Sequence, residues 1–595
     1  QVDNKAGAFV SAAEGGARRT VADEQRGAGM ASSARRAAAA LLILAVAGAR
    51  DAVDGHDKEL LERFAELERM VQGQQRMLES QTGLIETQQG RIQTLESRVP
   101  ASVSSIGAGA LDARRLQTSV SPSIFGTSAN GDAYTDTQSI QGAMTHMWLI
   151  LCGVLVLLMQ AGFVLVKMGS CRASSAQSIL LAGFLEVCLA TMGWWISGWS
   201  LAYSGPMEIV DRTAYKATRL VGYEQFAGHQ FLLERSDTQI EPTVLMASWF
   251  FTWACCAVAA AIVSGGMAER MLCPGYFLYT LLFSACIYPV VVGSSKGMGW
   301  LTIEVNQIGY TDFAGAGIIH MSGGVGALVG ALVVGVRAGR FERPDEFAAH
   351  NVPLVALGTF LLWFGWYGLN CGSTMSMSSI ENGFLAAQVA MNTTISAATG
   401  GLVALLVSRV VLRKYVITRF CNGILAGLVA ISAACGNVES SFACLIGAVG
   451  SLLYFGASLA LIKMGIDDPV DAFAVHGVAG AWGVLAAAIF DWGAGFDKFH
   501  GRFGFRCVMD VDGCKTGLAA DGIVANAAEI GAVFIFVGLV SLAILLPLRM
   551  MGLLKAKEEH QEMGVDERMH MPQKAYTIEP VIGKTPLFRA TLQAI

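Results

Sequence analysis

Charged residues are scarce in this 595-residue chain, and their scarcity restricts the class of protein. Only 15% of the residues are charged, whereas 53% are hydrophobic and the mean hydropathy is +0.49. Soluble domains carry about 25% charged residues, so this composition indicates a membrane protein. The formal net charge is −5 and the pI is near 6.0, so we expect no nucleic-acid partner.

The residue patterns of metal sites and enzyme active sites are also missing. The 13 cysteines are mostly scattered through apolar segments, where they are expected to act as small hydrophobic residues. No CxxC motif, Cys/His cluster, nucleophile–base pair or phosphate loop is found, so we expect no enzyme, no metal and no cofactor. Cys507 and Cys514 share one polar loop; whether they pair depends on whether that loop faces an oxidising compartment.

The N-terminal region is typical of a secreted leader. The chain begins with Gln, and Met30 opens the stretch MASSARRAAAALLILAVAGARDA. A basic pair, a short apolar run and a small-x-small end are the features of a signal peptide, and the run is too short to span a bilayer. We therefore predict a disordered leader and signal peptide over residues 1–49.

Residues 57–99 predict a coiled coil. Apolar residues alternate there at spacings of four and three, with Gln74, Gln81 and Gln88 on the same seam, and Pro100 ends the pattern. The stretch 100–142 is rich in Ser, Gly, Thr and Ala, which predicts a flexible linker. The coiled coil is expected to join copies of this chain or to bind another protein.

The remaining chain divides into a membrane domain at 143–549 and a C-terminal tail at 550–595. Eleven apolar segments have close to the ~20 residues that a bilayer requires. We therefore expect an all-α polytopic membrane protein. The segments are 145–169, 175–203, 243–266, 271–293, 313–336, 352–373, 384–408, 421–436, 440–463, 472–490 and 522–548.

Basic residues indicate the orientation of this domain. They fall on alternate connections, so the positive-inside rule predicts an extracellular N-terminus and a cytosolic tail. The predicted signal peptide requires the same orientation, and an odd number of spans satisfies both. The residues are Lys167, Arg172, Arg270, Arg337, Arg340, Arg343, Arg409, Arg413, Lys414, Arg419, Lys463, Arg549, Lys555 and Lys557.

One local pattern occurs twice. His320 in the fifth apolar segment and His476 in the tenth each follow an Asp by eight residues, Asp312 and Asp468, and each is followed by Gly at the fourth position. Ionisable residues within membrane spans usually mark a transport pathway. A repeat unit of five helices is odd, so the second copy must be inverted. We therefore predict two inverted five-helix repeats plus one helix, with both histidines near the midplane.

Several motifs resemble those of the ammonium transporter family (Amt/Mep, relatives of the Rh proteins). They are MQAGFVLVKMGSCRA at 159–173, AIVSGGMAERM at 261–271, DFAGAGIIHMSGGVGALVGAL at 312–332, WFGWYGLNCGS at 363–373 and DDPVDAFAVHGVAGAWG at 467–483. GVDERMHMPQKAY at 564–576 is similar to a loosened form of the family's cytosolic tail motif. The resemblance implies eleven helices, a homotrimer and one pore per subunit. The predicted signal peptide fits the plasma membrane, and equally an internal or plastid membrane reached through secretion.

The resemblance also implies roles for individual residues. His320 and His476 match the twin pore histidines, and Trp366 matches a pore tryptophan. Trp300, Ser373, Asp312 and Phe251 match residues of an outer site that recruits ammonium. The two gate phenylalanines of the family are replaced by Cys255 and Leu369, which implies a smaller and less aromatic gate. Asp468 is the repeat equivalent of Asp312, and Asp312 is also expected to cap the fifth helix.

These residues predict a transport mechanism with ammonium or ammonia as its only small-molecule partner. An indole face and a hydroxyl attract the ammonium ion, and a dry pore admits neutral ammonia far more readily than the ion. Two imidazoles, each both donor and acceptor, then line the path. The alternatives are an ammonium sensor or transceptor with little flux, and an Rh-like gas channel. The tail is also a candidate binding site for a cytosolic regulator.

Overall fold

The computed structural model describes residues 136–576, apart from gaps at 205–206, 212–213, 218–220, 230, 232, 237–238, 242–243, 298, 304–308, 492–519 and 572–574. The predicted leader, signal peptide and coiled coil, and most of the predicted linker, lie outside the described residues. The same holds for Cys507 and Cys514. The first helix, α4 (Asp136–Ser170), begins within the stretch predicted as linker. No proline interrupts 136–142, and adding a residue to an existing helix is favourable.

The described chain contains nine helical segments long and apolar enough to cross a membrane, and two shorter apolar ones, at 417–432 and 473–489. They coincide with the eleven predicted spans. After α4 they are formed by α5 with α6 (Ala176–Gly193, Trp199–Tyr203), α7 (Leu245–Gly265), α8 with α9 (Cys273–Leu282, Tyr288–Ser294), α11 (Ser322–Val334), α12 (Val352–Gly372), α13 (Ile380–Val411), α14 (Ile417–Ser432), α15 (Ser440–Lys463), α16 (Ala479–Ile489) and α18 (Asp521–Met550).

Four π-helical turns continue these segments. They are η2 (Trp194–Gly198) between α5 and α6, η4 (Phe283–Ile287) between α8 and α9, η5 (Ala316–Met321) before α11 and η7 (Phe473–Val478) before α16. A π turn inserts one extra residue into a helical turn and is frequent at functional sites. Two of the four carry the twin histidines.

The connections hold the small elements. Two antiparallel hairpins, β1 (Met207–Asp211) with β2 (Ala214–Ala217) and β3 (Leu233–Ser236) with β4 (Gln239–Glu241), follow α6. A single helical turn, α10 (Trp300–Ile303), follows α9, and α19 (Glu558–Met563) and α20 (Val565–Met569) follow α18. Three 3₁₀ turns complete the chain: η1 (Ala173–Ser175), η3 (Phe226–Gly228) and η6 (Pro344–Phe347).

Close helix packing explains the glycine content of the spans. A side chain at Gly162 or Gly358 would meet backbone atoms of the facing helix in the α4–α12 contact, at 2.9 and 2.7 Å. The α13–α14 contact is built in the same way at Gly400 and Gly427. Lipid tails are as apolar as Leu, so membrane helices associate through such close contacts rather than through the hydrophobic effect.

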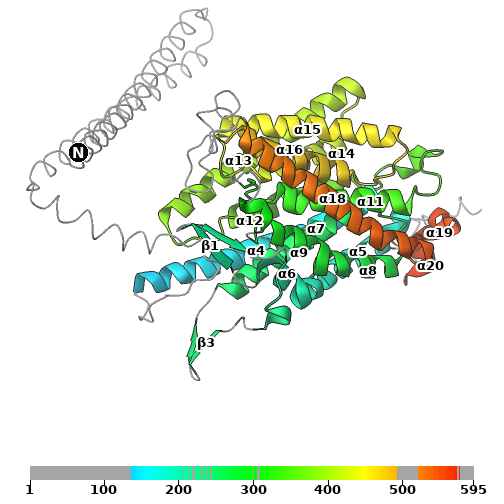
Figure 1. The fold of residues 1–595 in the computed structure, drawn as a ribbon. Helices are drawn as coiled ribbons and strands as arrows, with labels where there is room; N and C mark the ends of the chain where they lie inside the picture. The colour runs from blue at the N-terminus through cyan, green and yellow to red at the C-terminus, as the bar shows by residue number, and fades with distance from the viewer. Residues whose placement is uncertain are drawn as a thin grey trace, which may run out of the picture. The chain divides into compact units, whose positions relative to one another are not determined.

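The segment after α18 defines one side of the bundle, which we call the tail side. Met271 forms a β-bridge with Lys555, and Gln561 accepts a hydrogen bond from the Ala338 N–H. Figure 1 shows α19 and α20 beside the adjacent ends of α5 and α8. The basic connections noted in the sequence lie on this side, whereas the hairpins and α10 lie on the opposite side.

Candidate functional site

The two histidines meet in the centre of the bundle. His320 lies on η5 and His476 on η7, and their side chains are 0% and 5% exposed. The ring centroids are 5.4 Å apart with an interplanar angle of 25°. Neither ring nitrogen of His320, nor Nδ1 of His476, has a hydrogen-bond partner among the described residues. The structure therefore brings the two predicted pore histidines side by side.

The glycine that follows each histidine allows this meeting. A Cβ at Gly324 would lie 2.3 Å from the Gly477 nitrogen, and a Cβ at Gly480 would lie 2.7 Å from the Ala316 carbonyl oxygen. Each helix therefore crosses the other at a glycine one turn after its own histidine. Any larger residue at either glycine would separate the rings, because the atoms it would meet belong to the backbone.

The two aspartates occupy matching places at the start of these segments. The Asp312 carboxylate accepts the N–H groups of four successive residues, Gly315–Ile318, at 2.8–3.0 Å. Asp468 accepts the Phe473 N–H at 2.8 Å. These are the N–H groups that the first turn of a helix leaves without partners. Asp312 therefore acts as the predicted cap, and it fixes the segment that carries His320.

Two aromatic side chains hold the imidazole pair in place. The Trp366 ring on α12 stacks on His320, with centroids 4.7 Å apart and an interplanar angle of 16°. Its Nε1–H donates to Ser432 Oγ at 3.0 Å, which fixes the indole. Phe163 on α4 lies 5.9 Å from His476, with the rings tilted. Of these positions the sequence indicated Trp366 only.

The residues assigned to the outer end of the path lie on three elements. Phe251 on α7 packs against Gly372, where a Cβ would meet its ring at 2.5 Å. Ser373 directly follows that glycine, and its hydroxyl donates to the Leu369 carbonyl at 2.8 Å. Trp300 begins α10, which lies against α9 and α18. The structure thus places Phe251 beside the glycine that precedes Ser373.

The two gate positions are buried. Cys255 on α7 is 5% exposed and Leu369 on α12 is 0% exposed. Cys255, Cys152 and Cys371 are all free, buried cysteines. The described residues contain no group of three or more His, Cys, Asp or Glu arranged to hold a metal ion.

A small cavity lies on the tail side of His476. Its volume is about 20 Å³, enough for one water molecule, and Phe163, Leu362 and Asn422 are among its lining residues. Lys167 also lines it. The sequence predicts Lys167 in a basic connection between spans. This prediction is wrong, because Lys167 lies within α4 and its side chain is 3% exposed.

Two helices provide partners for the buried Lys167 ammonium. It donates to Glu186 on α5 and to Ser264 Oγ on α7, both at 2.8 Å, and more weakly to the Ala261 carbonyl at 3.5 Å. A lysine is retained inside a bundle only when its charge is compensated in this way. Its carboxylate partner lies on another helix, which periodicity along one segment cannot reveal.

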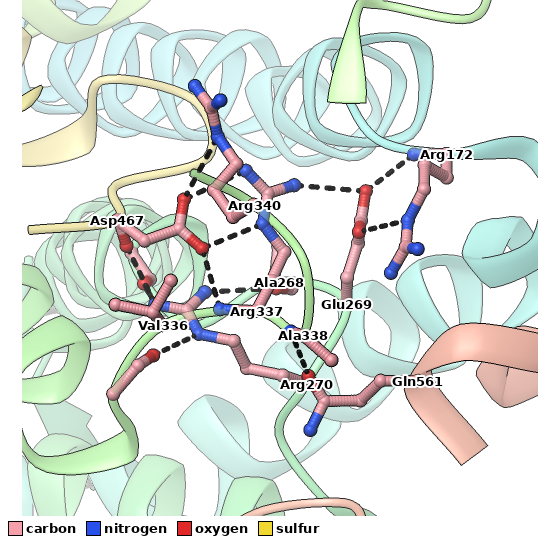
Figure 2. A network of polar contacts seen from close by, with 12 residues as sticks. Arg172, Ala268, Glu269, Arg270, Val336, Arg337, Ala338, Arg340, Asp467 and Gln561 are labelled. Atoms are coloured by element: carbon pink, nitrogen blue, oxygen red, sulfur yellow. Dashed lines mark hydrogen bonds and ion pairs between the residues drawn. The ribbon is translucent and has the colours of Figure 1, made fainter. Parts of the chain in front are cut away.

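An ion-pair network links the connections on the tail side. Figure 2 shows Arg337 between the carboxylates of Glu269 and Asp467, which it contacts at 3.1 and 2.9 Å. Arg172 binds the far side of Glu269 at 2.9 Å, and Arg270 donates to the Asp467 carbonyl at 2.7 Å. The network joins the end of the third span to the beginning of the tenth.

The network sets the charge states of its acids. Burial alone would raise the pKa of Asp467, but hydrogen bonds and charge from Arg337 outweigh burial and lower the pKa from 3.8 to about 2. Arg337 and Arg172 likewise outweigh burial at Glu269 and lower its pKa. The adjacent Asp468 lacks such a partner; burial and the nearby Asp471 raise its pKa to about 7.

The tail docks onto this side through polar contacts. The Asp566 carboxylate accepts the N–H groups of Gln177 and Ser178, both at 2.8 Å, and thereby caps the first turn of α5. His570 Nε2 lies 2.7 Å from Ser178 Oγ. The tail motif at 564–576 thus includes an aspartate, Asp566, that caps the N-terminus of α5.

Comparisons with known proteins agree with this geometry. Residues 147–576 match the profile of the Ammonium Transporter Family. The putative ammonium transporter 1 of Caenorhabditis elegans is 32% identical over 456 residues, 73% of this chain and 80% of that protein. Ammonium transporter Amt2 of Archaeoglobus fulgidus is 31% identical over 61% of this chain and 75% of its own. A solved structure titled "Sensor Amt Protein" has a TM-score of 0.61 and 29% identity, covering 72% of this chain and 98% of its own.

Proposed function

Because the chain belongs to the ammonium transporter family, we propose that it takes up ammonium on the side opposite the tail and conducts it as ammonia past His320 and His476. The observation that carries this proposal is the stacked imidazole pair, buried where η5 and η7 meet. Polar rings are retained in a bundle interior when they serve a pathway. The chain thus takes its place in a transporter family rather than an enzyme family.

The chemistry of the path favours ammonia over the ion. An unpaired ammonium ion has a prohibitive free energy in a dry apolar pore, whereas neutral ammonia requires only hydrogen-bond partners. His320 offers two unpartnered ring nitrogens and His476 offers one. Each neutral imidazole presents one donor and one acceptor, which suits ammonia and allows a proton to move separately.

Recruitment belongs to the outer end of the path. Trp300 supplies an indole face, and Phe251 and Ser373 supply an aromatic edge and a hydroxyl. Cation–π attraction is worth about 0.5–2 kcal/mol, enough to concentrate ammonium at this end. The main role of Asp312 is to hold the start of the segment that carries His320, because its carboxylate already accepts hydrogen bonds from four N–H groups there. Cys255 and Leu369 form a smaller gate than two phenylalanines would.

The assembly and orientation complete the proposal. The chain forms a homotrimer with one pore per subunit, built from two inverted repeats of five helices and one further helix. The basic connections place the tail side in the cytosol, and the N-terminus is extracellular. The plasma membrane is the proposed location, and the tail segment at 564–576 is the proposed docking site for a cytosolic regulator.

A sensor with little flux is the second candidate function. The similarity to a structure titled "Sensor Amt Protein" favours it, as do the altered gate residues. A third candidate, an Rh-like gas channel, would not need a cation site at its outer end. The two alternatives predict opposite results for uptake. A sensor binds ammonium without transporting it, whereas a gas channel transports neutral ammonia and produces no current.

The test is transport by the purified full-length protein in liposomes. We expect labelled methylammonium uptake and an ammonium-dependent current in the wild type. His320→Ala and His476→Ala each remove one imidazole from the path, and each variant should lose selective ammonium transport, by about 100-fold or more, while it still assembles. Current and uptake are measured on the same preparation.

The matched control is His146→Ala. His146 lies on α4 near its outer end, away from the imidazole pair, and its Nδ1 lies 2.8 Å from the Gly142 carbonyl oxygen. This variant should transport like the wild type. Wild-type uptake and selectivity in both pore variants would contradict the role of the imidazole pair, and binding without uptake in the wild type would favour the sensor.

A further inference from the structure

A lysine stands at the outer end of the proposed path. Lys296 lies in the connection between α9 and α10, on the side opposite the tail, and is half-buried. Its ammonium donates a hydrogen bond to the Phe313 carbonyl at 2.9 Å. Among the described residues it has no carboxylate ion pair, unlike Lys167 on the tail side. Its charge is therefore not neutralised by a direct partner.

The carbonyl that Lys296 binds belongs to the segment leading to His320. Phe313 directly follows Asp312, its N–H donates to the Ala433 carbonyl, and its ring lies against Gly436. Non-helical chain within a membrane domain occurs where it lines a cavity or is packed in protein, and its carbonyl groups can then accept hydrogen bonds from cations. The lysine thus uses an acceptor of the kind that a bound ammonium ion would use.

The hydrogen bond places Lys296 beside the proposed outer site. Its acceptor, Phe313, directly follows Asp312, one of the residues proposed to recruit ammonium, and the Asp312 carboxylate caps the segment that carries His320. The lysine is half-buried there, so its charge lies at the start of the segment that leads to the imidazole pair.

We propose that the Lys296 ammonium is a tethered cation that competes with ammonium at the outer end of the pore and sets the apparent affinity of uptake. An alkylammonium head has the charge and the N–H donors of methylammonium, so both suit the same acceptors. A fixed positive charge also lowers the local concentration of incoming cations. Lys296 is therefore a specificity-determining residue, and this proposal rests on the proposed transport function.

The test measures uptake of labelled methylammonium against its concentration, in oocytes that express the full-length chain. Lys296→Gln removes the charge and keeps a hydrogen-bond donor for Phe313. Competition for one site changes KM rather than kcat. We expect the apparent KM to fall about tenfold, with kcat within about twofold of wild type, because a fixed charge at the path is worth about that much.

Two further variants separate charge from structure. Lys296→Met removes both the charge and the hydrogen-bond donor. If the charge is decisive, the KM falls in Lys296→Met as it does in Lys296→Gln. If the hydrogen bond to Phe313 is decisive instead, the KM changes in Lys296→Met alone. Lys463→Gln removes the same charge at the tail-side end of α15, where the side chain is exposed, and should keep the wild-type KM. Surface abundance is measured for each variant, so that poor folding is not mistaken for weak transport.

The outcomes distinguish this proposal from the proposed function. If the wild type transports and Lys296→Gln keeps its KM, the tethered cation is wrong and the transport function stands. If the wild type moves no methylammonium, transport is wrong. In that case, methylammonium binding to the purified protein tests the competition directly. Tighter binding to Lys296→Gln than to the wild type would support the competition, and equal binding would overturn it.

Discussion

Three aspartates show how position decides the role of one residue type. Asp312 is fully used by backbone N–H groups, Asp467 by arginines, and Asp468 keeps one oxygen without a described partner. Of these three aspartates, Asp467 is the one whose negative charge is stabilised by direct pairing with arginines. Its effect on stability depends on pH, because protonation abolishes its pairing with Arg337.

Acid should destabilise the protein through Asp467. A pKa lowered from 3.8 to about 2 contributes stability that is complete above about pH 4 and is lost as the pH falls toward 2. At neutral pH this is worth about 2 kcal/mol. We expect Asp467→Asn to lower the melting temperature of the detergent-purified protein at pH 7 and to flatten its decline between pH 4 and pH 2.

Asp345→Asn is the control for this acid effect. Asp345 lies exposed in η6 on the same side, so its replacement should leave both the melting temperature and its pH profile unchanged. An Asp467→Asn profile parallel to that of the wild type would assign the acid sensitivity to another group, such as Glu269.

Residues of the path were predictable where the signal was local. The two histidines, their aspartates and the following glycines share one spacing along the chain, and the structure gives each of these a matching place. Lys167 and Ser432 were not predictable as path residues, because their partners Glu186 and Trp366 lie on other helices. A single sequence carries no record of which helices will touch.

At the scale of elements, the spans were predictable and their internal turns were not. Eleven apolar segments became nine long and two shorter helices, because bilayer thickness fixes the length of a span. The π turns leave no such signal, since one extra residue in a turn barely changes an apolar pattern. The hairpins after α6 were missed because their strands are only three to five residues long.

The tail should detach when its cap on α5 is removed. Asp566→Asn keeps the size of the side chain but loses the charge that stabilises the first turn of α5, which is worth about 1 kcal/mol. We expect faster hydrogen exchange over 556–570 and an altered transport rate. Glu567→Gln, its exposed neighbour, should change neither. Unchanged exchange in Asp566→Asn would show that the remaining contacts, such as Gln561 with Ala338, hold the tail alone.

At the scale of the whole molecule, the charges form two different layers. The tail side concentrates its acids and arginines in one buried network, and the tail covers part of it. The opposite end of the proposed path instead holds the single groups Lys296 and Ser373, each of which donates to a backbone carbonyl. A buried network on the tail side and single groups on the other side suit the proposed pore, whose selectivity would be set where the ion arrives.

The heptad stretch at 57–99, outside the described residues, remains a sequence prediction and concerns the proposed trimer. Three chains that leave one such trimer would have a high effective concentration for one another, so a seam diluted by Gln74, Gln81 and Gln88 would be sufficient for pairing. We predict a parallel three-stranded extracellular stalk. Cysteines at the core positions Ile85 and Ile92 should therefore cross-link between subunits of the intact protein under mild oxidation.

The control places the cysteine on the outer face of the same predicted helix. Glu86 and Gln93 each follow a core position by one residue, so cysteines there point away from the seam and should cross-link far less. A trimeric membrane domain with no intersubunit product from Ile85→Cys or Ile92→Cys would contradict the stalk. A product of different mass, joined to another protein, would instead identify the stretch as a docking helix. Equal yields at core and outer positions would indicate three mobile strands that collide without a fixed register.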